Sequence, residues 1–118
     1  MWSRLSETTT LYRPTGPEEL RLIEASGYRR WPPRLPEQPI FYPVTNEAYA
    51  IEIASKWNAK DGGCGFVTRF QVRSEFMRRY PIQQVGGAGH TERWVPAADL
   101  DLLNDNIVGL IEVIHSFP

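Results

Sequence analysis

Apolar and polar side chains alternate most regularly along residues 65–72. A period of two places successive side chains on opposite faces, so this segment is predicted to be a β-strand with one mainly apolar face. The apolar face would carry Phe66, Thr68, Phe70 and Val72, and the opposite face Val67, Arg69 and Gln71.

Five further segments are predicted as strands because they are short and rich in β-branched or aromatic residues. They span 9–13, 40–44, 82–85, 90–95 and 107–114. Pro14 is expected to end the first of them, and residues 86–89 are expected to form a hairpin turn between 82–85 and 90–95. The last segment is almost wholly apolar, so we expect it in the middle of its sheet.

Helical spacing and end signals predict four short helices, over 17–26, 46–58, 74–80 and 96–104. The second would turn Ala50, Ile53, Ala54 and Trp57 toward the core, and a turn over 60–63 would follow it. The segment 28–39 holds four prolines and is predicted to be an extended surface loop. Because helices come early and strands cluster late, the order favours an α+β fold.

The length of 118 residues fits one domain, which we place at 9–118 after a flexible N-terminal segment at 1–8. The net charge of -1 argues against binding to nucleic acid by bulk charge, although eleven of the thirteen basic residues are arginine. No apolar run is long enough for a membrane span or a signal peptide, so the sequence predicts a cytoplasmic protein.

Cysteine and histidine offer little chemistry in this sequence. Cys64 is the single cysteine, which excludes an intramolecular disulfide and a cysteine-based zinc site. Neither His90 nor His115 has a second ligand at metal-binding spacing, so no metal is expected.

Aromatic side chains and one carboxylate are the stronger candidates for a binding site. The aromatic set could either pack the core or stack against a flat ligand ring; it comprises Tyr12, Trp31, Phe41, Tyr42, Trp57 and Trp94. In a strand, Glu92 would share a face with His90 and Trp94. Such a glutamate lies either at an exposed sheet edge or in a cleft.

Several segments, taken in order, resemble the ADP-ribosyltransferase-like superfamily. They are Leu11-Tyr12-Arg13, the helix at 17–26, Phe41-Tyr42-Pro43 with the helix that follows it, and His90-Thr91-Glu92. The segments 34–44 and 94–97 are also similar to a family of small bacterial proteins labelled "ADP-ribosylation/crystallin J1". The superfamily resemblance implies a split β-sandwich with short helices and an NAD-binding cleft between its two sheets.

The resemblance also implies roles for individual residues. Arg13 corresponds to the first-strand residue that contacts the ribose or a phosphate of NAD, and Tyr42 to the aromatic residue that packs against nicotinamide. Glu92 corresponds to the glutamate that bonds the ribose hydroxyl and stabilises the cationic transition state, which makes it the predicted catalytic residue. Tyr12, His90 and Trp94 complete the expected NAD-binding set, with Trp94 helping to exclude water.

The same resemblance leaves more than one function open. The first is transfer of ADP-ribose from NAD to a protein or nucleic-acid acceptor, as a toxin or a regulator. His90 stands two residues before Glu92, where arginine-modifying members carry Gln or Glu, which argues against arginine as the acceptor. The superfamily's Ser-Thr-Ser motif is absent and the chain is small, which favours a second possibility: an inactive domain that binds a nucleotide or a protein. A third, transfer involving an RNA 2′-phosphate, would use the exposed arginines, but the net charge argues against it.

Overall fold

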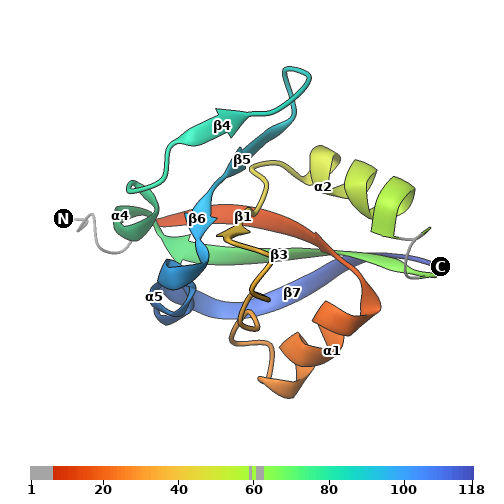
Figure 1. Cartoon of the computed structure of the whole chain (residues 1–118), viewed down its shortest axis with the longest axis horizontal. Coiled ribbons are helices and arrows are strands. Elements are labelled where there is room, and N and C mark those ends of the chain that lie inside the picture. Colours follow the sequence, from red (N-terminus) through yellow and green to blue (C-terminus); the bar gives the residue numbers. More distant parts are fainter. Residues whose placement is uncertain (1–6, 59, 61–62) are drawn as a thin grey trace.

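Strand β3 (Gly65–Arg73) is the middle strand of the main sheet (Figure 1). It pairs antiparallel with β1 (Thr8–Thr15) on one side and with β7 (Ile107–Phe117) on the other. The computed structural model describes residues 7–58, 60 and 63–118. The strand order β1-β3-β7 shows that the strongest alternating pattern in the sequence forms the centre of the sheet.

Four shorter strands extend the structure beyond β1. β2 (Ile40–Phe41) pairs with β6 (Val95–Pro96), and β4 (Ile82–Gln84) forms a hairpin with β5 (Thr91–Arg93). Val44 forms isolated β-bridges to Tyr12 on one side and to Glu92 on the other. The segment 40–45 therefore lies between the main sheet and the β4–β5 hairpin.

The principal core covers the face of β3 that carries Phe70 and Val72, as the alternation predicts. Helix α1 (Pro17–Ala25) contributes Ile23, and helix α5 (Leu100–Asp105), after the 3-10 turn η3 (Ala97–Asp99), contributes Leu100 and Leu103. Helix α4 (Ser74–Met77) adds Phe76 and Met77 at one end. These buried apolar side chains supply the hydrophobic stabilisation of the domain.

The proline-rich segment 28–39 is an extended loop without helix or strand, as predicted. Trp31 is fully buried and packs edge-on against Phe70, with 5.0 Å between ring centroids. The buried Asn104 side-chain amide accepts a hydrogen bond from the backbone N–H of Trp31 at 2.8 Å. It also donates a hydrogen bond to the backbone carbonyl oxygen of Trp31 at 3.1 Å. These two bonds satisfy the backbone N–H and carbonyl groups of Trp31, which lies outside any helix or strand.

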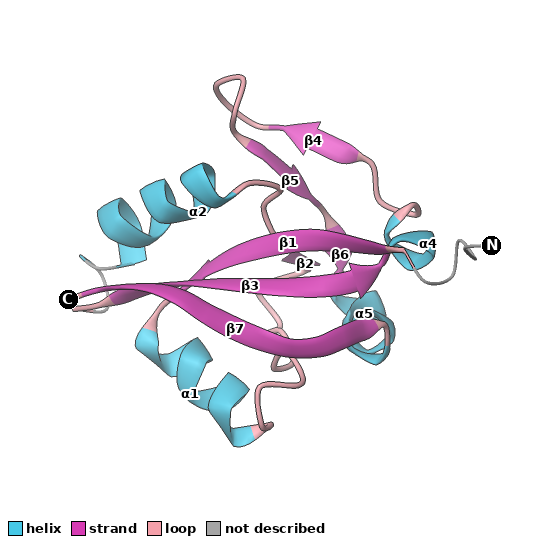
Figure 2. Cartoon of the chain, turned by 180° about the vertical axis from the view of Figure 1, so that it is seen from behind, coloured by secondary structure: helices cyan, strands magenta, loops and turns pink. Residues whose placement is uncertain are grey.

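The opposite face of the sheet is covered at one end by helix α2 (Glu47–Ile53) and the π-helical turn η2 (Ala54–Asn58) (Figure 2). Ala50 and Ala54 pack there against Val44 and Val67 in a second apolar cluster. Asn46 begins α2 by accepting a hydrogen bond from the Tyr49 N–H at 2.8 Å. Helices and strands both contribute layers, which confirms the α+β class.

Pro14 does not end the first strand, contrary to the prediction: β1 continues to Thr15, and Pro14 pairs with Val67. The reason is the direction of the backbone N–H groups. Tyr12 donates its N–H to the Val44 oxygen, away from β3, and position 14 faces the same way because the period is two. The N–H that proline lacks is therefore not needed in the β1–β3 ladder.

The last strand lies at the sheet edge, so the prediction of a central position was wrong. Ile111 is buried, but Val108, Leu110 and Val113 are at least two-fifths exposed. β7 also carries register shifts against β3, and Gly109 has a φ of +81°. Irregularities of this kind are over-represented in strands at sheet edges.

Trp57 was predicted to face the core, but it is 65% exposed. The helix changes to π geometry from Ala54 onward. Each residue of the wider π turn rotates the chain less than in an α-helix, so Trp57 leaves the face that Ala50 and Ala54 share. Residues 61–62 of the turn predicted at 60–63, and residues 1–6 of the flexible segment predicted at 1–8, lie outside the described residues. Thr8, at the end of that N-terminal segment, belongs to β1.

The other predicted elements are present, but the strand predicted at 40–44 is only β2 (Ile40–Phe41), and the helix predicted at 74–80 ends at Met77. The strand at 90–95 is divided at Trp94 into β5 and β6, and the helix at 96–104 begins instead at Ala97 as a 3-10 turn. The Gly86–Gly89 turn closes the hairpin, where the Val85 N–H donates to the His90 oxygen at 2.9 Å. None of the helices in the described ranges is long and apolar enough to cross a membrane.

Gly65 allows η2 to lie directly on β3. A Cβ atom at Gly65 would overlap the carbonyl oxygen of Ala54 and lie 3.0 Å from the Asn58 Cβ. We expect Gly65→Ala to lower the free energy of unfolding by about 2 kcal/mol, because two backbones would be forced apart. Chemical denaturation measures this, with Gly89→Ala as the control, since a Cβ at Gly89 meets no atom within 4 Å. Equal losses in the two variants would contradict the close packing.

Candidate functional site

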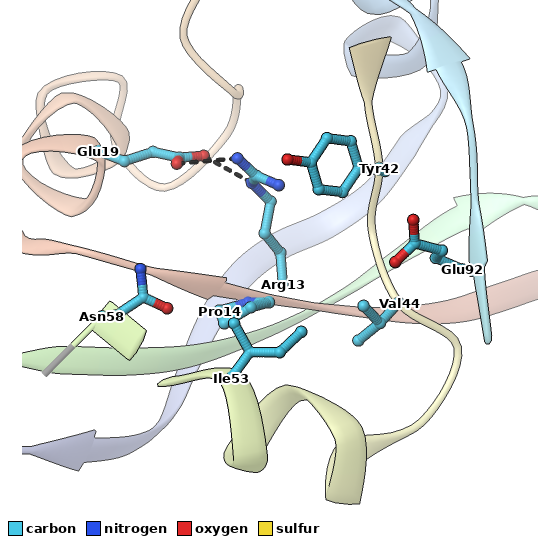
Figure 3. A pocket seen from close by; sticks show the side chains of 8 residues that line it. All are labelled: Arg13, Pro14, Glu19, Tyr42, Val44, Ile53, Asn58 and Glu92. Atoms are coloured by element: carbon cyan, nitrogen blue, oxygen red, sulfur yellow. Dashed lines mark hydrogen bonds and ion pairs between the residues drawn. The ribbon is translucent and has the colours of Figure 1, made fainter. Parts of the chain in front are cut away.

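A pocket of about 180 Å³ lies where β1, α1, η2, the segment 42–44 and β5 meet (Figure 3). It collects side chains from five separate parts of the chain. They are Arg13, Pro14, Glu19, Tyr42, Val44, Ile53, Asn58 and Glu92. Arg13, Tyr42 and Glu92, three of the candidate residues from the sequence analysis, thus line one pocket.

Arg13 is 8% exposed and is held by a carboxylate from the first turn of α1. Its Nε and one terminal nitrogen donate to the two carboxylate oxygens of Glu19, at 2.8 and 3.0 Å. This two-point contact fixes the guanidinium plane (Figure 3). The guanidinium keeps N–H groups that Glu19 does not use, since arginine has five.

Aromatic rings surround the same guanidinium. The Arg13 Cζ lies 4.7 Å from the centroid of Phe41 and 5.9 Å from that of Tyr42. Arg34, from the proline-rich loop, also packs on Phe41, at 5.8 Å. Burial, with a smaller contribution from the charge of Arg13, lowers the pKa of the Arg34 guanidinium from its usual value. Two arginines therefore share this aromatic wall, and Glu19 neutralises one of them.

Glu92 is 9% exposed and lies within β5, between Gln83 of β4 and Val44. The Trp94 indole N–H donates to its Oε1 at 2.8 Å, and the Tyr49 hydroxyl approaches Oε2 at 3.5 Å. Burial and the neighbouring Glu92 charge raise the pKa of the Tyr49 hydroxyl, so Tyr49 stays protonated and able to donate. Glu92 is thus a buried carboxylate held from two sides.

His90 was grouped with Glu92, but it does not line this pocket. Its ring stacks on Tyr49, with centroids 4.5 Å apart, and its Nε2 lies 2.9 Å from the Glu52 carboxylate. His90 lines a separate hollow between α2 and the glycine turn. His90 precedes β5, which begins at Thr91, and Tyr49 contacts both the His90 ring and the Glu92 carboxylate.

Trp94 lines a second hollow that adjoins the first. This hollow is lined by Ile40, Tyr42, Glu92 and Trp94. Tyr42 and Glu92 thus line both hollows; Arg13 and Glu19 line only the first, and Ile40 and Trp94 only the second. Both aromatic rings are accessible, with Tyr42 47% and Trp94 42% exposed.

Tyr12 does not join the pocket. It points to the opposite face of β1 from Arg13, where it packs against the cluster of Val44, Ala50, Ala54 and Val67. Of the six predicted residues, the structure therefore gathers Arg13, Tyr42 and Glu92 in one pocket, and Trp94 beside it. Tyr12 packs against the core and His90 lies one ring away.

Sequence reasoning missed three residues of the site: Glu19, Tyr49 and Asn58. Glu19 lies in the first turn of α1, where an acidic residue is explained by its favourable interaction with the helix dipole alone. Tyr49 follows the Asn46 cap, and its spacing from Ala50 and Ile53 indicated only helix packing. Asn58 reaches the pocket through the π turn, for which the sequence carried no signal.

The described residues contain no cluster of three or more His, Cys, Asp or Glu side chains that could hold a metal ion. Comparison of the chain with protein-family models, with curated proteins and with solved structures finds no match. The assignment of a function therefore depends on the geometry of the pocket and on the sequence pattern.

The Arg13–Glu19 pair gives a direct test of the pocket geometry. Their side chains are 10% and 21% exposed, so Glu19→Gln leaves a buried guanidinium without its counter-charge. We expect a loss of about 2 kcal/mol in the free energy of unfolding. Glu18→Gln, one residue earlier, is the matched control: Glu18 is 82% exposed and pairs only with Arg21, so its loss should stay below about 0.5 kcal/mol. Similar values for both variants would contradict the buried pair.

Proposed function

We propose that the chain is an ADP-ribosyltransferase-like protein that binds NAD in the Arg13–Tyr42–Glu92 pocket and transfers ADP-ribose to a macromolecule. The observation that supports this most directly is the convergence of the three residues. They are separated by 29 and 50 positions in the sequence, yet all three line one pocket. They are also the three residues to which the resemblance assigns the phosphate or ribose contact, the ring contact and the catalytic carboxylate.

The proposed chemistry breaks the bond between the nicotinamide nitrogen and the ribose carbon. The electron pair of this bond leaves with nicotinamide, so the positively charged pyridinium ring becomes neutral. A lone pair of the acceptor atom forms the new bond to the ribose carbon. The acceptor loses one proton. Positive charge develops on the ribose during this step, and a fixed carboxylate stabilises it electrostatically. Glu92 suits this role because Trp94 and Tyr49 orient it before the ligand arrives.

The pocket volume of about 180 Å³ is below the roughly 300 Å³ at which sites for drug-sized ligands begin. In our proposal the pocket therefore holds one part of NAD, the nicotinamide ribose and an adjoining phosphate. The remainder lies over the surface. The free N–H groups of Arg13 would contact the phosphate, and Tyr42 would face the nicotinamide ring.

One observation favours the alternative, an inactive domain that binds a nucleotide or a protein. Arg13 already makes two short hydrogen bonds to Glu19, so a phosphate at Arg13 would lie close to a second negative charge. This repulsion weakens phosphate binding and is compatible with a site that binds without turning its ligand over. Measurement of turnover separates the two functions.

We expect wild-type protein to bind NAD in isothermal titration calorimetry and to release nicotinamide, with water serving as acceptor in the absence of a known one. Glu92→Gln should retain binding within a few-fold and release nicotinamide roughly 100-fold more slowly, because it removes the charge that stabilises the transition state. Glu112→Gln changes an exposed carboxylate on β7 and should leave both measurements unchanged.

The outcomes separate the two proposed functions. Absence of NAD binding by the wild type overturns both NAD transfer and NAD as the bound nucleotide. Binding without nicotinamide release supports the inactive domain. Equal release by wild type and Glu92→Gln removes Glu92 from the mechanism. Thermal melts of all three proteins exclude unfolding as the cause of a lost activity.

A further inference from the structure

Arg34, in the proline-rich loop, carries a positive charge that pairs with no carboxylate among the described residues. Its side chain is partly buried and packs on the ring of Phe41, with 5.8 Å between Cζ and the ring centroid. Its hydrogen bond within the described chain runs from Nη2 to the Ile40 carbonyl oxygen at 3.1 Å. A cation that is drawn partly out of water without a counter-charge opposes folding, so this position is typical of a site for an anion.

One nitrogen of the Arg34 guanidinium remains available to a ligand. Nε is buried and has no partner in the part of the chain that the structure describes, and Nη2 is bonded to the Ile40 oxygen. Nη1 makes no hydrogen bond there either, but it is not buried. An anion that arrives from solvent can therefore accept a hydrogen bond from Nη1.

Arg34 lies beside the candidate pocket without lining it. The guanidinium of Arg13 packs on the same Phe41 ring, with 4.7 Å between Cζ and the ring centroid. Burial lowers the pKa of the Arg34 guanidinium, and the nearby charge of Arg13 lowers it further, while Glu19 acts in the opposite direction. Both oxygens of Glu19 are already bonded to Arg13, at 2.8 and 3.0 Å. The edge of the pocket thus holds two guanidinium groups and one carboxylate, which leaves one positive charge without a partner.

We infer that Arg34 binds the second phosphate of a diphosphate whose first phosphate lies at Arg13, so that this site takes a diphosphate ligand in preference to a monophosphate. The inference rests on the proposed function, in which the ligand is NAD and the pocket of about 180 Å³ holds the nicotinamide ribose and one phosphate. One bridging oxygen joins the second phosphate to the first. The second phosphate must therefore lie at the edge of the pocket, beside Arg34.

The charges at this edge favour a diphosphate. A phosphate at Arg13 alone is repelled by the Glu19 carboxylate, which lies 2.8 Å from the Arg13 Nε. A second guanidinium offsets that repulsion, because its attraction to the ligand acts over a similar range. The planar N–H groups of arginine also match the geometry of phosphate oxygens. Arg34 is therefore a binding residue, and Glu92 keeps the proposed catalytic role.

The first test is Arg34→Gln, which removes the charge and keeps an N–H donor for the Ile40 oxygen. We expect NAD binding to weaken roughly tenfold or more in isothermal titration calorimetry, because a charge-assisted hydrogen bond to phosphate is lost. The Tm without ligand should equal or exceed that of the wild type, because a partly buried cation without a counter-charge is gone. Arg34→Lys retains the charge and should bind NAD more tightly than Arg34→Gln.

Arg29→Gln is the matched control, since Arg29 belongs to the same loop, is exposed and carries the same charge. It should leave NAD affinity unchanged. Two further ligands identify the phosphate that Arg34 contacts. ADP-ribose keeps both phosphates and should lose as much affinity for Arg34→Gln as NAD does. Nicotinamide mononucleotide carries the first phosphate alone and should bind the wild type and Arg34→Gln equally.

Four results would overturn the inference. Equal NAD affinity of the wild type and Arg34→Gln would remove Arg34 from binding while leaving the proposed function intact. An equal loss for nicotinamide mononucleotide would show that Arg34 does not act on the second phosphate. An equal loss in Arg29→Gln would show a general attraction between charges. Absence of NAD binding by the wild type would overturn the proposed function, and this inference with it.

Discussion

The pairing of Val44 on both sides is the constraint on which the pocket depends. Its N–H and oxygen exchange hydrogen bonds with Tyr12 at 2.7 and 2.9 Å, while Pro43 and Thr45, on either side of it, bond to the backbone of β5. One residue thus joins the main sheet to the hairpin. Arg13 follows Tyr12, Tyr42 precedes Val44 by two positions, and Glu92 lies opposite Val44. The three candidate residues are brought together by backbone pairing, before any ligand is considered.

The sequence predicted the local elements well where one strong signal acted alone. The alternation along 65–72 identified the central strand, and Pro17 and Gly27 marked the ends of α1. It failed where tertiary contacts decided the outcome. Pro14 stays in a strand because its N–H would have pointed away from β3, and Trp57 is exposed because the helix changes to π geometry. Neither effect is encoded in a local window, since each depends on a segment distant in the chain.

The candidate site likewise contains residues that were selected from the sequence and residues that were not. Arg13, Tyr42 and Glu92 are the residues that the family resemblance selects, and one pocket contains all three. The side chains that position them were not found. Glu19 and Tyr49 have ordinary local explanations as helix-start and helix-packing residues, and only the folded arrangement shows that they hold Arg13 and Glu92. Residues that act through another residue leave little trace in a single sequence.

The charged groups of the site are held in place without a ligand. Arg13 and Glu92 are buried, and each has neighbours that fix its orientation, so their geometry is set in the free protein. A pocket of this kind is preorganised, because a ligand then binds without the cost of ordering these side chains.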